Sequence, residues 1–474
     1  MKGHSRILGF LALPVLALGL FWFAERRPGY FTNQIYLGGI LLLEIVAVAV
    51  WHYEKAFFPV LMLSFLWAGT DLPLVGAANA VRWVFLFVGA LVGVVKWAEG
   101  LQRRPFQAIH LMAFLCILSA AVSSMVSAHL PISLLKGASL LLLFLYGSFG
   151  ARVAVRGREA TFFRGLLISC EIASYFTAVL YIGLHFEFLG NPNSLGAVMG
   201  VVVAPILLWG VLVADDRGLR QRRAIAFGLA SYLLFASLSR AGILACAIAA
   251  TTLCLALHRG KLLIQGAFAL VFLVAALAVL QPARFDALAS SFTEDVVYKG
   301  KPEQGLLGSR KSPWQDTMAV IRESPWFGSG FGTDRREANA GADSLVATRE
   351  GSAKEHGTSY LALLQYVGLL GIIPFGILIL MVLLMIRRVC LWMWRTRSPY
   401  HYAVPLAMMC LAGLVHAIFE DWLFAVGYYL SVFFWTSVFI LADLQPPTPQ
   451  ESVVLSSALR VPRGAGRVPL SVGQ

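Results

Sequence analysis

The chain has 474 residues, of which 58% are hydrophobic and only 13% are charged. Soluble domains carry roughly 25% charged residues, so this composition excludes a water-soluble globular protein. Apolar blocks long enough to cross about 30 Å of hydrocarbon recur along the chain, and in lipid such blocks must be helical because no water satisfies the backbone. They do not alternate in polarity as barrel strands would. We therefore expect an all-α fold, a polytopic transmembrane helix bundle of about 12–14 spans.

The formal net charge of +13 is concentrated in short connections. Short basic loops are typical of cytoplasmic turns, so topology accounts for most of this charge and no nucleic-acid partner is indicated. The six cysteines show no metal-ligand spacing, which favours small core residues over redox chemistry. The basic clusters are Arg152, Arg156 and Arg158; Arg217, Arg220, Arg222 and Arg223; and Arg387, Arg388, Arg395 and Arg397.

Fourteen apolar segments are predicted as spans, and the first of them, after Lys2 and Arg6, is expected to be a retained helix. With the N-terminus inside, the basic connections fall in the cytoplasm, and the outer connections 71–76, 128–130, 185–193 and 419–421 carry no Lys or Arg. Arg26 and Arg27 are an exception to this alternation. The predicted spans are 7–24, 31–51, 57–70, 77–97, 107–127, 131–150, 161–184, 194–214, 224–238, 241–257, 262–280, 358–386, 402–418 and 422–442.

Four parts of the chain follow from this pattern. Residues 1–280 form the N-terminal part of the bundle, and residues 281–357 form one long folded loop on the periplasmic side. Residues 358–442 form the C-terminal part of the bundle. The tail 443–474 contains Pro446, Pro447 and Pro449 with few aromatic residues, so we predict a disordered cytoplasmic segment.

The long loop contains its own predicted helix. Ser312 is placed at the N-cap and Pro313 at the first helical position. Trp314, Met318 and Ile321 then recur at helical spacing and predict one apolar face. Ser324-Pro325 ends the helix, and a turn-rich exit follows with Gly328, Gly330 and Gly332.

Charged residues within spans are costly and often functional. Glu44, Lys136, Arg164 and Glu171 are such residues, and a transporter would need charges of this kind. Several lie near a span end, where a long side chain can reach water. They form no repeated pattern of inverted halves, so these charges alone do not indicate transport.

Polar residues at the predicted outer face offer more chemistry, and each has two interpretations. Arg240 either caps the preceding helix or binds an anionic headgroup, since a guanidinium donates two parallel bonds to a phosphate. Asn191 and Asn193 either begin a helix as an N-cap or bind sugar hydroxyls. His356 is either a solvated loop histidine or a base that takes a proton from a hydroxyl.

Four blocks between about 185 and 440 resemble the O-antigen ligase and O-antigen polymerase superfamily, which includes exopolysaccharide polymerases. Each block alone is weak evidence, but their order and the long loop between the second and the fourth are specific to the superfamily. The blocks are GNPNSLG at 190–196; LSRAG at 238–242; GSR at 308–310 with Trp314 and PWFGSGFG at 325–332; and HGTSYL at 356–361, which is followed by GLLG at 368–371.

The resemblance implies a GT-C-like membrane glycosyltransferase of the bacterial inner membrane that acts at the periplasmic face. Its donor would be an undecaprenyl-pyrophosphate-linked glycan, and its acceptor a glycan or the lipid A core, during exopolysaccharide or lipopolysaccharide synthesis. Membrane lipids and other polysaccharide-assembly proteins would be its remaining partners. Arg240 and Arg310 would hold the donor pyrophosphate, and His356 would activate the acceptor. Gly357 stands where asparagine is common in relatives, so a hydrogen-bonding partner of the histidine is either missing or supplied elsewhere.

We expect no cofactor and no metal, since arginine can neutralise the departing diphosphate by itself. A polymerase is slightly favoured over a ligase. The rival from another class is a lipid-linked oligosaccharide flippase or another polysaccharide transporter, which would place its key charges in a central cavity rather than at the outer rim.

Overall fold

The structure, a computed structural model, describes residues 57–73, 75–99, 106–186, 191–266, 308–333 and 356–447, together with positions 48, 189, 268, 275 and 279. Every regular element in these ranges is helical, which confirms the all-α prediction. The elements are Phe57–Ala68, α4 (Val75–Ala98), α5 (Ala108–Ser124), α6 (Leu130–Leu145), η1 (Tyr146–Gly150), α7 (Ala151–Val155), α8 (Glu159–Ala178), η2 (Val179–Gly183), α9 (Pro192–Ala197), η3 (Val198–Val203), α10 (Ala204–Leu212), α11 (Arg217–Ala236), α12 (Arg240–Ala256), α15 (Gly308–Glu323), α16 (Ser359–Thr396), α17 (Ala403–His416) and α18 (Tyr429–Asp443).

Hydropathy located the membrane helices well. Five helices in the described ranges are long and apolar enough to cross a membrane, and five shorter apolar helices accompany them. The protein is therefore a multi-pass membrane protein. Each predicted span in these ranges coincides with a helix, although α16 has 38 residues and continues well past the predicted end at 386. The predicted spans 7–24, 31–51 and 262–280, and the tail beyond 447, lie wholly or mostly outside the described residues.

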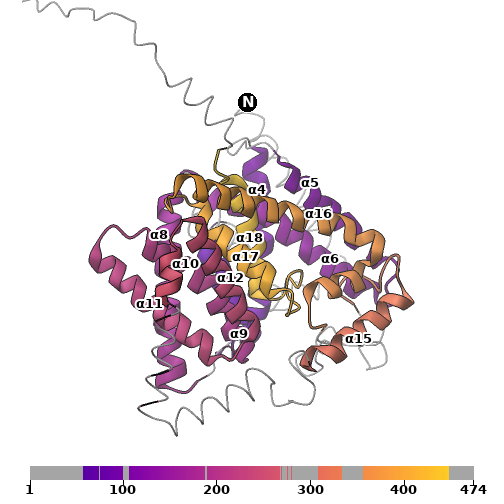
Figure 1. Ribbon diagram of the computed structural model, residues 1–474. Coiled ribbons are helices and arrows are strands. Elements are labelled where there is room, and N and C mark those ends of the chain that lie inside the picture. Colours follow the sequence, from indigo (N-terminus) through magenta and orange to yellow (C-terminus); the bar gives the residue numbers. More distant parts are fainter. Residues whose placement is uncertain are drawn as a thin grey trace, which may run out of the picture.

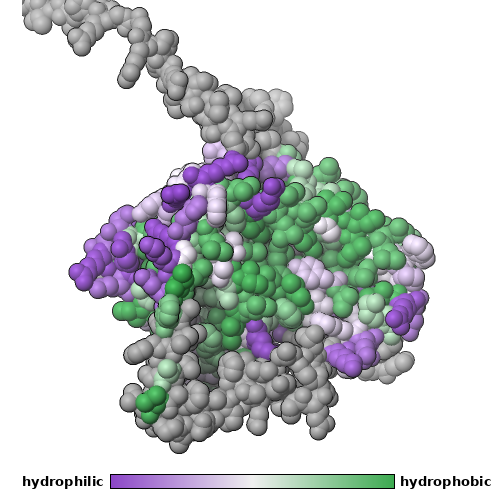
Figure 2. Space-filling model, in the orientation of Figure 1, coloured by the Kyte–Doolittle hydropathy of each residue, from purple (hydrophilic) through white to green (hydrophobic). Residues whose placement is uncertain are grey.

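The last two helices form the centre of the bundle. Nearly every residue of α17 and α18 is buried, and both lie among the other helices in Figure 1. α16 packs on α5 and α17, and α12 packs on α17. Figure 2 shows hydrophobic side chains over much of the described face, with hydrophilic residues gathered over α11 and α15. An apolar outer surface is what a lipid-embedded bundle requires.

Contacts at the two ends of the spans agree with the predicted alternation. Three of them join residues in or near connections predicted on one face, here named the His356 end, and three join residues in or near connections predicted on the other face, here named the Asp443 end. At the His356 end the pairs are Arg82 Nη1 with Gly427 O (2.7 Å), Ser127 with Thr333 (2.8 Å) and His356 with Asp421 (2.8 Å). At the Asp443 end they are Arg152 with Asp443 (2.6 Å), Trp209 Nε1 with Pro399 O (2.8 Å) and His258 with Trp394 O (3.1 Å).

The predicted loop helix exists, but two of its details are wrong. α15 begins at Gly308, so Pro313 lies inside the helix and Ser312 is not its N-cap. Met318 is exposed, whereas Thr317, Val320 and Ile321 are buried, so the buried face includes Ile321 as predicted but not Met318. The end before Ser324-Pro325 is confirmed. The rest of the predicted loop, 281–307 and 334–355, lies outside the described residues.

The charged residues within spans have different surroundings. Glu171 is buried and ion-paired to Arg222 (2.8 Å) and Arg223 (3.5 Å), which ties α8 to α11. Lys136 donates a hydrogen bond to the Gly332 carbonyl. Arg164 is exposed, and Glu44 lies outside the described residues. Glu171 is thus accounted for by packing between helices.

Candidate functional site

The long helix α16 is broken near the His356 end. Gly368 has φ 67° and ψ −176°, which is not helical, so the carbonyls one turn before it lose their usual partners. The segment Pro325–Thr333, here named the exit segment, supplies the missing bonds. Ser329 N donates to Gln365 O (2.9 Å), Gly330 N to Tyr366 O (3.2 Å), Leu369 N to Pro325 O (2.7 Å) and Leu370 N to Trp326 O (3.1 Å).

Glycine is required on both sides of this junction. Gly328 has φ 75°, a left-handed conformation that glycine adopts without the steric cost of a side chain. A Cβ on Gly368 would lie 2.5 Å from Gly328 N and from Trp326 C, closer than real contacts allow. The two glycines therefore permit the exit segment to lie directly against the break.

His356 lies immediately before α16 and is paired with an acid. Its Nδ1 is 2.8 Å from Asp421 Oδ2, and the two side chains are 5% and 20% exposed. Its Nε2 is buried and has no hydrogen-bond partner among the described residues. A carboxylate that accepts a hydrogen bond from Nδ1–H fixes the tautomer in which Nε2 carries the lone pair. This arrangement leaves Nε2 able to accept a proton.

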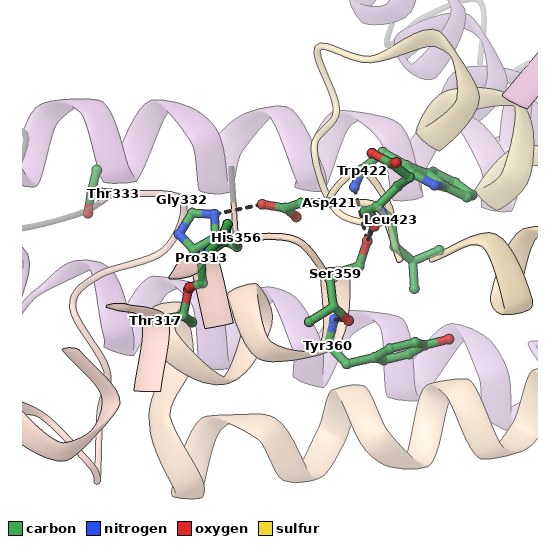
Figure 3. Close-up of polar contacts among 12 residues, drawn as sticks. Pro313, Thr317, Gly332, Thr333, His356, Ser359, Tyr360, Asp421, Trp422 and Leu423 are labelled. Atoms are coloured by element: carbon green, nitrogen blue, oxygen red, sulfur yellow. Dashed lines mark hydrogen bonds and ion pairs between the residues drawn. The ribbon is translucent and has the colours of Figure 1, made fainter. Parts of the chain in front are cut away.

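The start of α16 holds the connection that carries Asp421. Ser359 Oγ donates to Glu420 O (2.7 Å) and accepts from the backbone N–H groups of Trp422 and Leu423, both at 3.0 Å. The bonds to Trp422 and Leu423 are drawn in Figure 3, where the His356–Asp421 pair lies beside them. Ser359 N also donates to Ala417 O (3.0 Å). One serine thus fixes residues on both sides of Asp421, and this limits the movement of the carboxylate relative to the imidazole.

The other side of the imidazole meets α16. The Tyr366 ring lies edge-on to His356, with centroids 5.2 Å apart. The interpretation of His356 as a solvated loop histidine is wrong, because the residue as a whole is only 4% exposed.

The glycine after the histidine has a structural reason. Gly357 has φ 71°, in the left-handed region where glycine is easiest and asparagine is the best tolerated of the other residues. Glycine at this position therefore keeps a conformation that asparagine also permits. The partner of His356 comes instead from Asp421.

A second cluster at the same end joins the first two sequence blocks. A Cβ on Gly196 would lie 2.7 Å from Ser239 Oγ, and one on Gly242 would lie 2.5 Å from Gly196 O, so α9 and the start of α12 touch backbone to backbone. Ser239 is the N-cap of α12 and accepts from Gly242 N (3.3 Å). Arg240 is therefore the first residue of α12, and it is half-buried.

The predicted sugar-binding asparagines lie beside this junction. Asn191 is the N-cap of α9, where its Oδ1 accepts a hydrogen bond from Asn193 N at 2.8 Å. The geometry therefore supports the N-cap interpretation of Asn191. Asn193 is half-buried. Arg310 lies in α15, and its side chain is outside the described part of the chain.

One connection touches both clusters. Residues 417–428, here named the α17–α18 connection, carry Asp421 against His356 near one end and Tyr428 near the other. Tyr428 OH donates to Ser194 Oγ (3.4 Å) and is 3.0 Å from Tyr429 OH. The structure thus brings α9 and the start of α12 together in one cluster and His356, Asp421 and Tyr366 together in another. The α17–α18 connection contacts the first cluster at Ser194 and the second at His356.

Asp421 was missed from the sequence. Its connection was noted only for its lack of Lys and Arg, and 65 residues separate it from His356. One signal was present, since Glu420 and Asp421 are adjacent acids in a short outer connection. Two consecutive spans in an alternating bundle must bring this connection to the same end as the residues before 358. That argument predicts the neighbourhood, although not the contact.

Comparison with known families gives one match. The family described as O-antigen ligase matches residues 225–376, a stretch that includes Arg240, α15, the exit segment, His356 and the break in α16. No curated protein matches the chain. The family match supports the O-antigen ligase and polymerase superfamily and covers three of the four blocks that carried the resemblance.

Proposed function

We propose that the chain is a membrane glycosyltransferase of the O-antigen ligase and polymerase superfamily, a proposal supported by the family match over residues 225–376. Its donor is a polyprenyl-pyrophosphate-linked oligosaccharide, and the transfer occurs at the His356 end, on the periplasmic face of the inner membrane. The observation that carries this proposal is the His356–Asp421 pair, which leaves Nε2 without a partner among the described residues.

In the proposed reaction, the hydroxyl oxygen of the acceptor sugar attacks the anomeric carbon of the donor. The bond between that carbon and the phosphate oxygen breaks, and polyprenyl diphosphate leaves with the electron pair. The hydroxyl proton passes to His356 Nε2. Asp421 accepts the hydrogen bond from Nδ1 and stabilises the imidazolium that forms, as an acid does behind a histidine base in other enzymes.

The departing diphosphate needs fixed positive charge. Arg240 and Arg310 are proposed to supply it, because a guanidinium donates two parallel hydrogen bonds to phosphate oxygens and keeps its charge at all physiological pH. Arg240 lies at the start of α12 in the cluster that the α17–α18 connection joins to His356. The proposal uses no metal, since the arginines provide electrostatic stabilisation directly.

Two acceptors fit this site. A polymerase would extend one lipid-linked glycan with another, and a ligase would attach the glycan to the lipid A core. We favour the polymerase slightly, because the sequence of the long loop and the glycine at position 357 resemble the exopolysaccharide polymerases of the superfamily more than its ligases. The flippase alternative needs charges in a central cavity, and the buried Glu171, ion-paired to two arginines, offers it little support.

The test is turnover by the purified, reconstituted chain with defined polyprenyl-diphosphate-linked repeat units, with and without the lipid A core. Longer lipid-linked glycan formed without the core is the expected result. Glycan found only on the lipid A core would make the protein a ligase and would leave the proposed transfer reaction unchanged. Movement of the substrate across the bilayer, with no new glycosidic bond under either condition, would contradict the proposal and favour the flippase.

A further inference from the structure

A row of polar side chains on α5, α6 and the turn between them contacts the exit segment and the break in α16. Ser133 Oγ donates to Phe331 O (2.9 Å), and Ser127 Oγ lies 2.8 Å from Thr333 Oγ1. Ser123 Oγ donates to Tyr366 O, and Lys136 Nζ donates to Gly332 O. We name Ser123, Ser127, Ser133 and Lys136 the polar row.

The exit segment is held from two sides. The backbone at the break in α16 binds it on one side, and the polar row binds it on the other. Gly330 has φ 105° and Gly332 has φ 70°, so the segment cannot form the regular structure that would satisfy its own carbonyls. The polar row donates to two of these carbonyls, at Phe331 and Gly332.

Lys136 is the charged member of the row, and it lies in an otherwise apolar helix. A lysine within a membrane helix is costly unless its ammonium group reaches a polar partner. Here the side chain runs against Gly332, where an added Cβ would collide with Lys136. The ammonium donates to that residue's carbonyl. The lysine therefore has a specific partner in the exit segment.

The exit segment is linked to His356 by aromatic contacts. Phe331 is 2% exposed, and its ring centroid lies 6.2 Å from that of Tyr366. Tyr366 in turn lies 5.2 Å from His356. Aromatic pairs at these separations attract one another and are packed without voids. A shift of the exit segment would therefore move Tyr366 and disturb the imidazole.

We propose that Lys136 is a positioning residue for the transfer reaction. Through the Gly332 carbonyl it holds the exit segment against Tyr366, which keeps the His356 imidazole on Asp421. This inference rests on the proposed function for its effect on turnover. Its structural half, that Lys136 holds the surroundings of residue 356 closed, does not depend on any activity.

The structural half is tested by cysteine labelling. His356→Cys places a thiol at a position that is 4% exposed. A water-soluble maleimide should label this thiol slowly, after the labelling of the native cysteines in the parent protein has been subtracted. Adding Lys136→Met should raise the labelling rate about threefold or more, because the local structure opens more often. Lys136→Arg should restore slow labelling, since arginine can also donate to the carbonyl. Lys261→Met, an exposed lysine at the Asp443 end, is the matched control.

The second readout is turnover with the natural histidine present. Lys136→Met should lower kcat about 10-fold and leave the KM for the lipid-linked donor within about twofold, because misplacing a catalytic group affects the chemical step. Lys136→Arg should recover most of the rate. Ser133→Ala, a milder change in the same row, should act in the same direction and serves if Lys136→Met does not fold.

Three outcomes decide the matter. Unchanged labelling in Lys136→Met would overturn the positioning role. A raised KM with unchanged kcat would also overturn it and would make Lys136 a ligand of the donor phosphate. If Lys136→Met speeds the labelling of residue 356 but the protein without substitutions forms no glycosidic bond, the structural role is supported and the proposed function is refuted.

Discussion

Two polar pairs stand at opposite ends of this bundle, and each uses an aspartate from the last part of the chain. At the Asp443 end, Arg152 binds Asp443 through two bonds of 2.6 Å, and the side chains are 7% and 9% exposed. A third bond joins Arg152 Nη1 to Ser148 O (3.4 Å). At the His356 end, His356 makes one bond to Asp421, and Asp421 is 20% exposed. Each nitrogen of the Arg152 guanidinium is therefore bonded, whereas the buried Nε2 of His356 has no partner among the described residues.

This difference in hydrogen bonding indicates that the Arg152–Asp443 pair stabilises the fold and that the His356–Asp421 pair serves the proposed reaction. A buried ion pair in which each guanidinium nitrogen is hydrogen-bonded holds helices together and is expensive to break. An oriented imidazole whose second nitrogen makes no hydrogen bond costs the fold some stability. A catalytic base needs such a nitrogen, because it must accept a proton from the substrate. Substitutions in the first pair should therefore reduce stability, and substitutions in the second pair should reduce turnover.

The largest effect is expected from His356→Asn. Removing the base should lower kcat by about 10²- to 10⁴-fold, because general base catalysis contributes that range, while the protein still inserts and remains folded. Turnover of lipid-linked repeat units measures it. His185→Asn is the matched control, since His185 is an exposed histidine at the same end with φ 51°, which asparagine tolerates. Equal turnover by the two variants would remove His356 from the mechanism.

The next largest effect is on stability. Arg152→Met leaves Asp443 buried without its partner, so the free energy of unfolding should fall by about 3–5 kcal/mol. Thermal unfolding in detergent measures the loss, and kcat per folded molecule should be unchanged. Arg156→Met, at an exposed position four residues on, should have no effect on stability. A stable Arg152→Met protein with reduced kcat would reverse the roles assigned to the two ends.

Asp421→Asn should lower kcat by about 10²-fold, because an amide can donate to Nδ1 and so move the ring proton to Nε2, where it blocks the base. The KM for the donor should stay near its original value. The thermal midpoint should change much less than in Arg152→Met, since Asp421 is partly exposed. A rise in KM with unchanged kcat would instead assign Asp421 to substrate binding.

A smaller loss is expected from Arg240→Lys. One ammonium cannot reproduce the two parallel bonds of a guanidinium, so we expect about a 10-fold lower kcat/KM, since a charge-assisted hydrogen bond is worth about 1.5–3 kcal/mol. Arg217→Lys, at an exposed position of the Asp443 end, is the control. Full activity of the lysine variant would show that only the charge at residue 240 is needed.

The smallest effect is expected from a chelator, which should leave turnover unchanged if the arginines neutralise the diphosphate without a metal. The measurement compares the same reconstituted protein before and after treatment and after return of a divalent cation. Strong inhibition that the cation reverses would replace the metal-free mechanism.

Most of the bundle could be predicted because hydropathy depends on local composition alone. Apolar length and basic connections located the spans in the described ranges, and the alternation of faces agrees with the contacts between connections at both ends. The break in α16 could not be predicted in this way. Gly368 stands in an apolar run that is suited to a continuous helix, and only the docking of the exit segment makes the interruption stable.

The site could be predicted in part. Motif order found His356, and the superfamily match now covers that residue. Asp421 was out of reach because its contact depends on how α16 and α17 pack, and no spacing within the sequence encodes that. The start of α15 was misplaced for a related reason, since Ser312-Pro313 is a good local start signal that an additional helical turn from Gly308 overrides. The proposed roles of His356, Arg240, Arg310, Asn191 and Asn193 remain predictions.

The most direct test is a double-mutant cycle on kcat with His356→Asn, Asp421→Asn and the two together. If Asp421 acts through the imidazole, the double variant should turn over at the same residual rate as His356→Asn alone. If the two losses multiply, the carboxylate and the imidazole act independently, and the paired base proposed here is contradicted.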